Sequence, residues 1–104
     1  MSLRVGNGSM MRKVKEFIEE YGLTADLQSR YIDFVSETGE LGKAILSSTD
    51  YGTSPLRLTE DIQTEAGDVL FSLLTLFTEM GIDDEQLLDE VLETYRARLD
   101  QMAG

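Results

Sequence analysis

The chain has 104 residues and a formal net charge of −11, with 20 acidic and 9 basic residues. This length fits a single domain, and we do not expect so acidic a chain to bind nucleic acid or an anionic membrane surface. Histidine and cysteine are both absent, which excludes disulfides, metal sites built from imidazole or thiolate, and catalysis by either residue. Any metal site must therefore use oxygen ligands, which favours Mg²⁺, Mn²⁺ or Ca²⁺.

The first nine residues are rich in glycine and show no hydrophobic periodicity. We expect residues 1–9 to form a flexible leader in front of one helical domain over residues 10–104. The sequence has no apolar run long enough to cross a bilayer and no signal-peptide pattern, so we expect a cytoplasmic protein that makes no membrane contact.

Apolar residues at the helical period predict a first helix over about residues 10–21, with Gly22 as its end. A second helix is expected over about residues 25–47, with Thr24 as its N-cap. This helix contains Gly39 and Gly42, although glycine costs close to 1 kcal/mol inside a helix. Close approach of a neighbouring backbone or a ligand would explain why both are tolerated.

Residues 48–57 are rich in turn-forming residues and contain the only proline, so we expect a loop there. The third helix is predicted from an N-cap at Thr59 to an end at Gly81. It is apolar on most of its faces, which indicates a central helix or one covered by a partner chain.

Asp83 and Gln86 have the spacing of a capping box, and they mark the start of a fourth helix. Its apolar stripe consists of Leu88, Val91, Leu92, Tyr95, Leu99 and Met102. No strand pattern competes with these helices, so the sequence predicts an all-α fold arranged as a bundle of four helices.

Two acidic pairs interrupt the apolar stretches of the second and third helices: Glu37 with Glu40, and Glu65 with Asp68. We call these four residues the acidic quartet. A spacing of three places both carboxylates of a pair on one face of a helix. Their apolar neighbours indicate positions that face other helices, where a carboxylate is costly unless its charge is cancelled. No run of Lys or Arg lies nearby, so we predict a bound divalent cation with coordination positions left for water and a phosphate-bearing substrate.

The segments VSETGELGKAI and TEAGDVLFSLL, which carry the two pairs, resemble the MazG-like branch of the all-α NTP pyrophosphatase superfamily. That family is marked by Glu-x-x-Glu, a spacer and Glu-x-x-Asp, and here residues 41–64 separate Glu37-x-x-Glu40 from Glu65-x-x-Asp68. The resemblance covers about residues 10–102. It implies the four-helix fold of that superfamily, completed by dimerisation into a homodimer or homotetramer.

The resemblance also implies Mg²⁺-dependent hydrolysis of an NTP or dNTP between its α- and β-phosphates, with Mn²⁺ as a substitute metal. The products would be a nucleoside monophosphate and pyrophosphate, and removal of non-canonical nucleotides is one role that fits. The acidic quartet would supply the metal ligands, and Glu37 or Glu40 would also orient or deprotonate the attacking water. Other substrates of the superfamily, such as dUTP, dCTP or phosphoribosyl-ATP, stay open.

Four basic residues are candidates for contacts with the substrate phosphates. Lys43 lies one turn after Glu40, although an exposed ion pair would also explain it, and Arg57 lies on the predicted loop. Members of the family usually present Lys or Arg from the last helix, where this chain offers Arg96 and Arg98.

A different class of function fits the same composition. A non-catalytic acidic helical module could bind a protein partner or mimic nucleic acid, and its acids would be spread over the surface. A metal-dependent enzyme instead needs its acids to converge, so the placement of the acidic quartet separates the two hypotheses.

Overall fold

The computed structural model describes residues 9–103, in which all regular structure is helical. Four helices follow one another along this part of the chain: α1 (Ser9–Tyr21), α2 (Leu27–Ser48), α3 (Glu60–Met80) and α4 (Asp84–Ala103). The predicted all-α class with four helices is therefore confirmed. The predicted leader lies outside the described residues except for Ser9, which is the first residue of α1. None of the described helices combines the length and the apolar character needed to cross a bilayer.

Local interactions explain where most of the helices begin and end. Gly22 and Gly81 have φ values of 61° and 70°, which suit glycine, and they follow α1 and α3 directly. The Thr59 side chain accepts a hydrogen bond from the Ile62 backbone N–H at 3.2 Å, as expected of the N-cap of α3. These predicted boundaries are confirmed.

The predicted start of α2 is wrong by two residues. Asp26, not Thr24, is the N-cap, and its carboxylate accepts a hydrogen bond from the Ser29 backbone N–H at 2.8 Å. Hydrogen bonds with Ser29 lower the pKa of the Asp26 carboxyl, because they favour its charged form. Aspartate ranks above threonine as an N-cap, so the later of two nearby candidates begins the helix.

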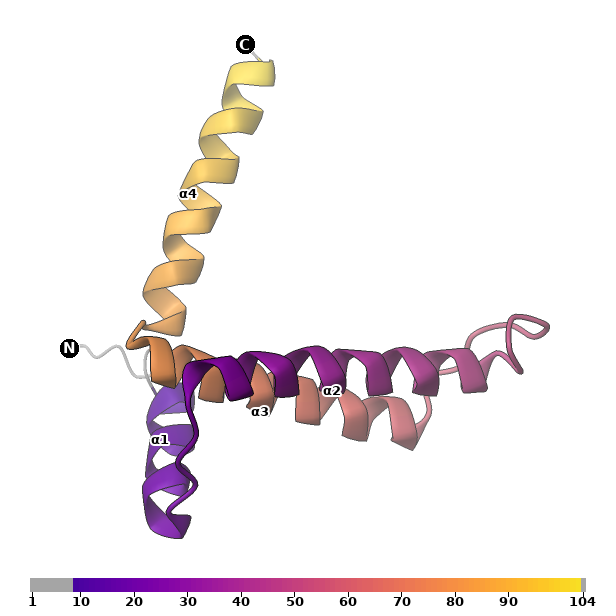
Figure 1. Ribbon diagram of the computed structural model, residues 1–104. Coiled ribbons are helices and arrows are strands. Elements are labelled where there is room, and N and C mark those ends of the chain that lie inside the picture. The colour runs from indigo at the N-terminus through magenta and orange to yellow at the C-terminus, as the bar shows by residue number, and fades with distance from the viewer. Residues whose placement is uncertain (1–8, 104) are drawn as a thin grey trace.

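Helices α2 and α3 form an antiparallel pair that lies side by side along most of its length, joined by the loop at its far end (Figure 1). Helix α1 also packs against α3, so α3 contacts both α1 and α2. It also carries the largest share of the buried side chains, which are Ile62, Ser72, Leu74, Thr75 and Leu76. The prediction of a central third helix is confirmed.

Polar interactions join α2 to α3 near the end opposite the loop. The Ser72 hydroxyl donates a hydrogen bond to an Asp33 carboxylate oxygen at 3.0 Å. Arg30, whose side chain is 12% exposed, forms an ion pair with Glu79 at 3.7 Å. Because Ser72 is buried, its bond to Asp33 satisfies a hydroxyl that would otherwise be costly to bury.

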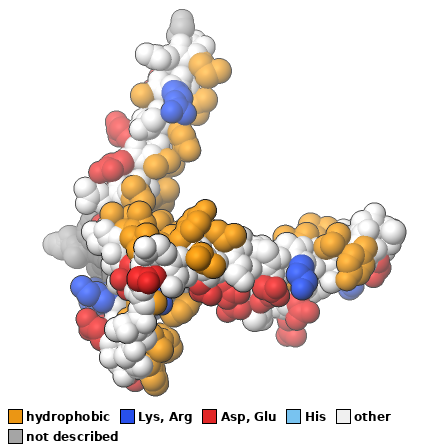
Figure 2. Space-filling model, in the orientation of Figure 1, with side chains coloured by type: hydrophobic (Ala, Val, Ile, Leu, Met, Phe, Trp, Pro, Cys, Tyr) orange, Lys and Arg blue, Asp and Glu red, His pale blue; other side chains and the backbone are white. Residues whose placement is uncertain are grey.

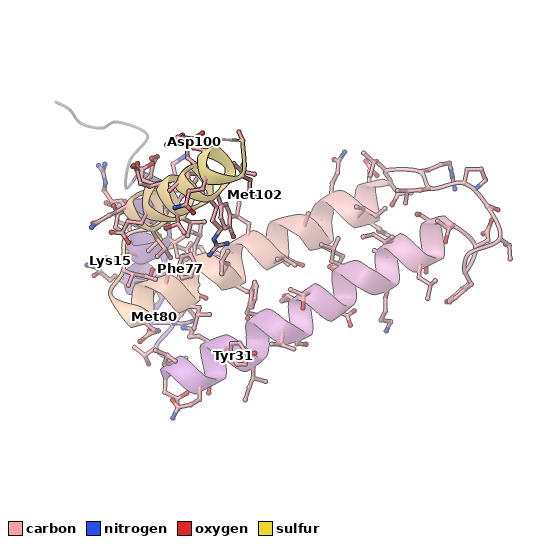
Figure 3. All side chains as sticks on the ribbon, turned by 90° about the horizontal axis from the view of Figure 1, so that it is seen from above. Lys15, Tyr31, Phe77, Met80, Asp100 and Met102 are labelled. Atoms are coloured by element: carbon pink, nitrogen blue, oxygen red, sulfur yellow. The ribbon has the colours of Figure 1, made fainter. Side chains whose placement is uncertain are left out.

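Helix α4 stands apart from the other three, so one chain does not form the predicted four-helix bundle (Figure 1). Figure 3 shows α4 nearly end-on, whereas α2 and α3 are seen along their lengths. No residue of α4 is buried. The radius of gyration is 17.3 Å, against about 13 Å for a compact chain of this length. Only residues 81–83 separate α3 from α4, and this short turn directs α4 away from the α2–α3 pair.

Candidate metal and substrate site

The antiparallel arrangement of α2 and α3 brings the two acidic pairs to one side of the helix pair. Glu37 and Glu40 lie near the middle of α2, and Glu65 and Asp68 lie in the first half of α3. Figure 2 shows acidic side chains gathered along the lower edge of this pair. Charge interactions of Glu37 and Glu65 with the other two members show that the whole quartet lies close together, although its members come from separate helices.

Electrostatic coupling links the quartet across the two helices. Partial burial, followed by the negative charges of Asp68, Asp33 and Glu40, raises the pKa of the Glu37 carboxyl above its ordinary value. The pKa of Glu65 is also raised, first by partial burial and then by its hydrogen bond with Asp68 and the charges of Asp68, Glu40 and Glu37. Like charges disfavour further ionisation, so the neighbouring carboxylates add to the effect of burial at both groups.

Lys43 is the one basic residue that pairs with the quartet among the residues that the structure describes. Its ammonium nitrogen lies 3.9 Å from a carboxylate oxygen of Glu40, three residues earlier on α2. Both side chains are well exposed, so this ion pair contributes little to stability. A single exposed ammonium group cannot neutralise four carboxylates.

An open groove of about 330 Å³ begins at Glu40 and Glu65, and this volume is at the lower end of the range for small-molecule sites. Its lining comes from both helices: Glu40, Lys43, Ala44 and Ser47 of α2, and Asp61, Thr64 and Glu65 of α3. The groove therefore combines carboxylates, hydroxyl groups and one ammonium group next to the acidic quartet.

Asp33 and Asp61 extend the acidic surface, and the sequence analysis missed both as site residues. Asp33 lies four residues before Glu37 and helps to raise its pKa. Asp61 lies four residues before Glu65 and lines the groove. A spacing of four places Asp33 on the same helix face as Glu37, and Asp61 on the same face as Glu65. This spacing is the sequence pattern that could have identified both residues.

The oxygen ligands of the quartet are the kind that Mg²⁺ prefers, although their side chains do not converge on one point. Within residues 9–103, no group of three acidic side chains is placed closely enough to hold a metal ion as it stands. Carboxylates repel each other when no positive charge lies between them, which opposes convergence of all four on one point. The donors are nonetheless all oxygen atoms, they come from two facing helices, and their charge is uncompensated. Glu37, Glu40, Glu65 and Asp68 are thus the residues that would hold the ion after side-chain rotation.

The other basic candidates lie outside the groove of the same chain. Arg57 belongs to the loop beyond α2 and is not part of the groove lining. Arg96 pairs with Glu93 at 3.8 Å, and the Arg98 guanidinium lies 5.7 Å from the centre of the Tyr95 ring. Both are on α4, which stands apart from α2 and α3 (Figure 1). A contact between either residue and the groove would have to come from a second copy.

Gly39 and Gly42 have free space around them. Within the described residues, no atom of a neighbouring segment lies within 4 Å of the position that a Cβ would take at either glycine. The expected close approach of another backbone of the same chain is therefore wrong. The α2 surface beside the acids is open to a ligand or to another molecule.

The chain is similar to the "Uncharacterized protein YpjD" of Bacillus subtilis (strain 168), with 31% identity over 90 residues that cover 84% of this chain and 77% of the relative. The part of the chain outside this match is shorter than either terminal segment that flanks residues 37–68. The match therefore includes both acidic pairs. No family model and no solved structure matches the sequence.

Proposed function

The chain belongs to the family of the Bacillus subtilis protein YpjD, and we propose that it is a Mg²⁺-dependent nucleoside triphosphate pyrophosphohydrolase of the MazG-like type. It would cleave an NTP or dNTP between the α- and β-phosphates. The observation that carries the proposal is the placement of the acidic quartet on two facing helices beside an open groove. The resemblance of both acidic motifs to the MazG-like signature supports the same chemistry.

Glu37 and Glu40 are the candidates for the general base. One of them would orient the attacking water and accept its proton while the water oxygen forms a bond to the α-phosphorus. The bond from that phosphorus to the bridging oxygen then breaks, and pyrophosphate leaves. Bound Mg²⁺ would offset the charge of the phosphates and polarise a phosphoryl oxygen.

The groove residues would hold the leaving phosphates. Lys43 is exposed and only weakly paired with Glu40, so its ammonium group is free to turn toward a phosphate oxygen. The hydroxyl groups of Ser47 and Thr64 lie in the same groove and can donate hydrogen bonds. Asp61 lies there too, and its charge favours an additional cation over a bare phosphate at that end.

We place the protein in the cytoplasm as a homodimer or homotetramer. The exposed stripe of α4 supports an assembly, because its large apolar side chains stay exposed within residues 9–103. Removal of non-canonical nucleotides is one role consistent with the proposed reaction.

Pyrophosphate release from a panel of canonical and modified NTPs and dNTPs tests the proposal. We expect release with Mg²⁺ or Mn²⁺, the matching monophosphate as second product, and no release with EDTA. The preferred member of the panel would identify the base and the sugar. Absence of release from every member at high protein concentration would contradict the proposal.

One observation favours a non-catalytic acidic module instead. Within the described chain no three carboxylates converge on a point, whereas an enzyme of this type needs convergence when its metal is bound. Thermal unfolding with and without Mg²⁺ separates the two, since a bound ion raises the melting temperature by mass action. A module without a metal site would show no such rise.

A further inference from the structure

The apolar stripe of α4 follows a heptad repeat, and within residues 9–103 it is left exposed. Leu88, Leu92, Tyr95, Leu99 and Met102 are spaced alternately by four and three residues, which is the a/d pattern of a coiled coil. These side chains are between 42% and 81% exposed. Figure 2 shows hydrophobic side chains along one side of α4, and in Figure 3 Met102 of the stripe and Asp100 leave the helix on different sides. A stripe of this kind requires a partner.

The charges on α4 argue against a lipid surface as that partner. The first part of the helix carries Asp84, Glu85, Asp89, Glu90 and Glu93. Helices that bind anionic membranes instead carry Lys and Arg on their polar face. A heptad stripe is complementary in shape to a second stripe with the same repeat, and a second copy of the chain offers one.

The residues that flank the stripe determine the direction of pairing. With Leu92 at position a and Tyr95 at position d, the e positions hold Asp89 and Arg96. In an antiparallel pair, e faces e along one side of the seam, so Asp89 of each copy lies opposite the partner's Arg96, which gives two such pairs. Both side chains are exposed in one chain, and Arg96 has only an exposed ion pair with Glu93 to give up.

A parallel pair would place like charges together. There g faces e of the next heptad, so Asp84 at g would lie opposite the partner's Asp89 on both sides. No pair of opposite charges would offset this repulsion, because the remaining g positions are Val91, which would face Arg96, and Arg98, which would face Ala103.

We propose that α4 forms an antiparallel two-helix seam with α4 of a second copy of this chain. Leu88 then packs on the partner's Leu99, and Leu92 packs on the partner's Tyr95. Glu85, at the remaining a position, lies at the end of the seam, where its carboxylate reaches water. The seam gives the homo-oligomer proposed above a defined interface, and it depends on no catalytic property of the protein.

Charge reversal at the two e positions tests the seam in the full-length chain. Asp89→Arg alone and Arg96→Asp alone each create two like-charge pairs, so each should weaken self-association by roughly three- to tenfold. The double variant Asp89→Arg/Arg96→Asp restores both attractive pairs and should associate like the parent. A mixture of the two single variants should form a heterodimer in preference to either homodimer.

Sedimentation velocity over a range of concentrations gives these association constants, and circular dichroism checks that every variant keeps its helical content. A parent chain that stays monomeric at all concentrations would overturn the proposal. Tighter association of Asp89→Arg would also overturn it, because that change removes the repulsion with Asp84 that only a parallel pair contains. The proposal would also be overturned if the double variant associated no more tightly than the single variants.

Engineered cysteines give a second measurement of direction, since the chain has no cysteine of its own. Mixed Leu88→Cys and Leu99→Cys chains should form a disulfide with each other under oxidation, and Leu99→Cys alone should not form one with itself. The reverse result would contradict the antiparallel seam. Neither measurement uses nucleotide hydrolysis, so failure of the seam and failure of the proposed function are distinguishable.

Discussion

Asp68 illustrates how a single carboxylate acts on residues of both helices. Burial is the largest cause of the raised pKa values of Glu37 and Glu65; Asp68 adds to it through its charge at Glu37 on α2, and through a hydrogen bond and its charge at Glu65 on its own helix. Uncompensated charge of this kind favours a bound cation, which would turn repulsion into attraction. Because Asp68 is itself exposed, its removal should weaken metal binding with little effect on packing.

We expect Mg²⁺ to raise the melting temperature of the parent chain and to have little effect on Asp68→Asn. The reason is that the variant loses a ligand and one quarter of the charge that attracts the ion. Glu20→Gln is the matched control, because Glu20 is an exposed acid on α1 outside the quartet. An equal rise in all three proteins would contradict the assignment of Asp68 as a ligand.

The raised pKa values of Glu37 and Glu65 predict opposite pH trends with and without metal. A carboxyl whose pKa is raised on folding above the ordinary 4.5 binds its proton more tightly in the folded state. Its contribution to stability is therefore fully present below the unfolded value and is lost as the pH rises through the folded value. Mg²⁺ binding needs the ionised form, so the stabilisation by Mg²⁺ should grow over that same pH range.

Melting temperatures between about pH 4 and pH 8, with Mg²⁺ or EDTA, measure both trends. Replacing both Glu37 and Glu65 by Gln should reduce the pH dependence of the melting temperature under both conditions. This result would assign the pH dependence to these two carboxyl groups and not to the other acids of the chain. A stabilisation by Mg²⁺ that is greatest at the acidic end would contradict the account.

At the scale of the element, α3 contributes most to the stability of the fold because it contacts both α1 and α2. Leu74 is 4% exposed on this helix. Leu74→Ala should lower the free energy of unfolding by about 3 kcal/mol, through lost burial and the cavity left behind. Leu58→Ala is the matched control, since Leu58 is 77% exposed, and it should cost less than about 0.5 kcal/mol. Chemical denaturation of both variants measures the difference, and equal costs would be inconsistent with a central α3.

Helix ends were predictable where one residue had a clear advantage. Gly22 and Gly81 adopt positive φ values, and Thr59 is the suitable cap immediately before its helix. The start of α2 was not predictable, because Thr24 and Asp26 both suit an N-cap and the hydrogen bond from Ser29 decides between them.

The acidic pairs were predictable from their spacing within each helix, but the groove was not. Asp61 lies in the first turn of α3, where an acid complements the helix dipole, and this position alone explains its presence in the sequence. Its place beside Glu40 depends on how α2 and α3 run past each other. Such pairing between helices is a tertiary property that residue spacing within one helix does not contain.

At the scale of the whole molecule, the extended shape of one chain is the largest difference from the sequence prediction. The apolar stripe of α4 indicates that this helix needs cover, and the sequence analysis predicted a four-helix bundle that dimerisation completes. Periodicity cannot show whether the cover comes from the same chain or from a second copy. The short turn over residues 81–83, which sends α4 away from α2 and α3, favours a second copy.

The same shape leaves the groove and α4 on separate parts of the chain. Metal binding by the acidic quartet and pairing through α4 are therefore expected to respond to different substitutions. Asp89→Arg should leave the stabilisation by Mg²⁺ unchanged in the monomer, and Asp68→Asn should leave the association constant unchanged.

We propose that the acidic quartet binds Mg²⁺ for hydrolysis of a nucleoside triphosphate. The decisive experiment measures pyrophosphate release by the parent chain and by Glu40→Gln side by side, with Mg²⁺ and with EDTA. We expect release by the parent only with the metal, and a rate at least about 100-fold lower for the variant, with Glu20→Gln at the rate of the parent. Equal release by the parent and Glu40→Gln, or release that persists in EDTA, would contradict it.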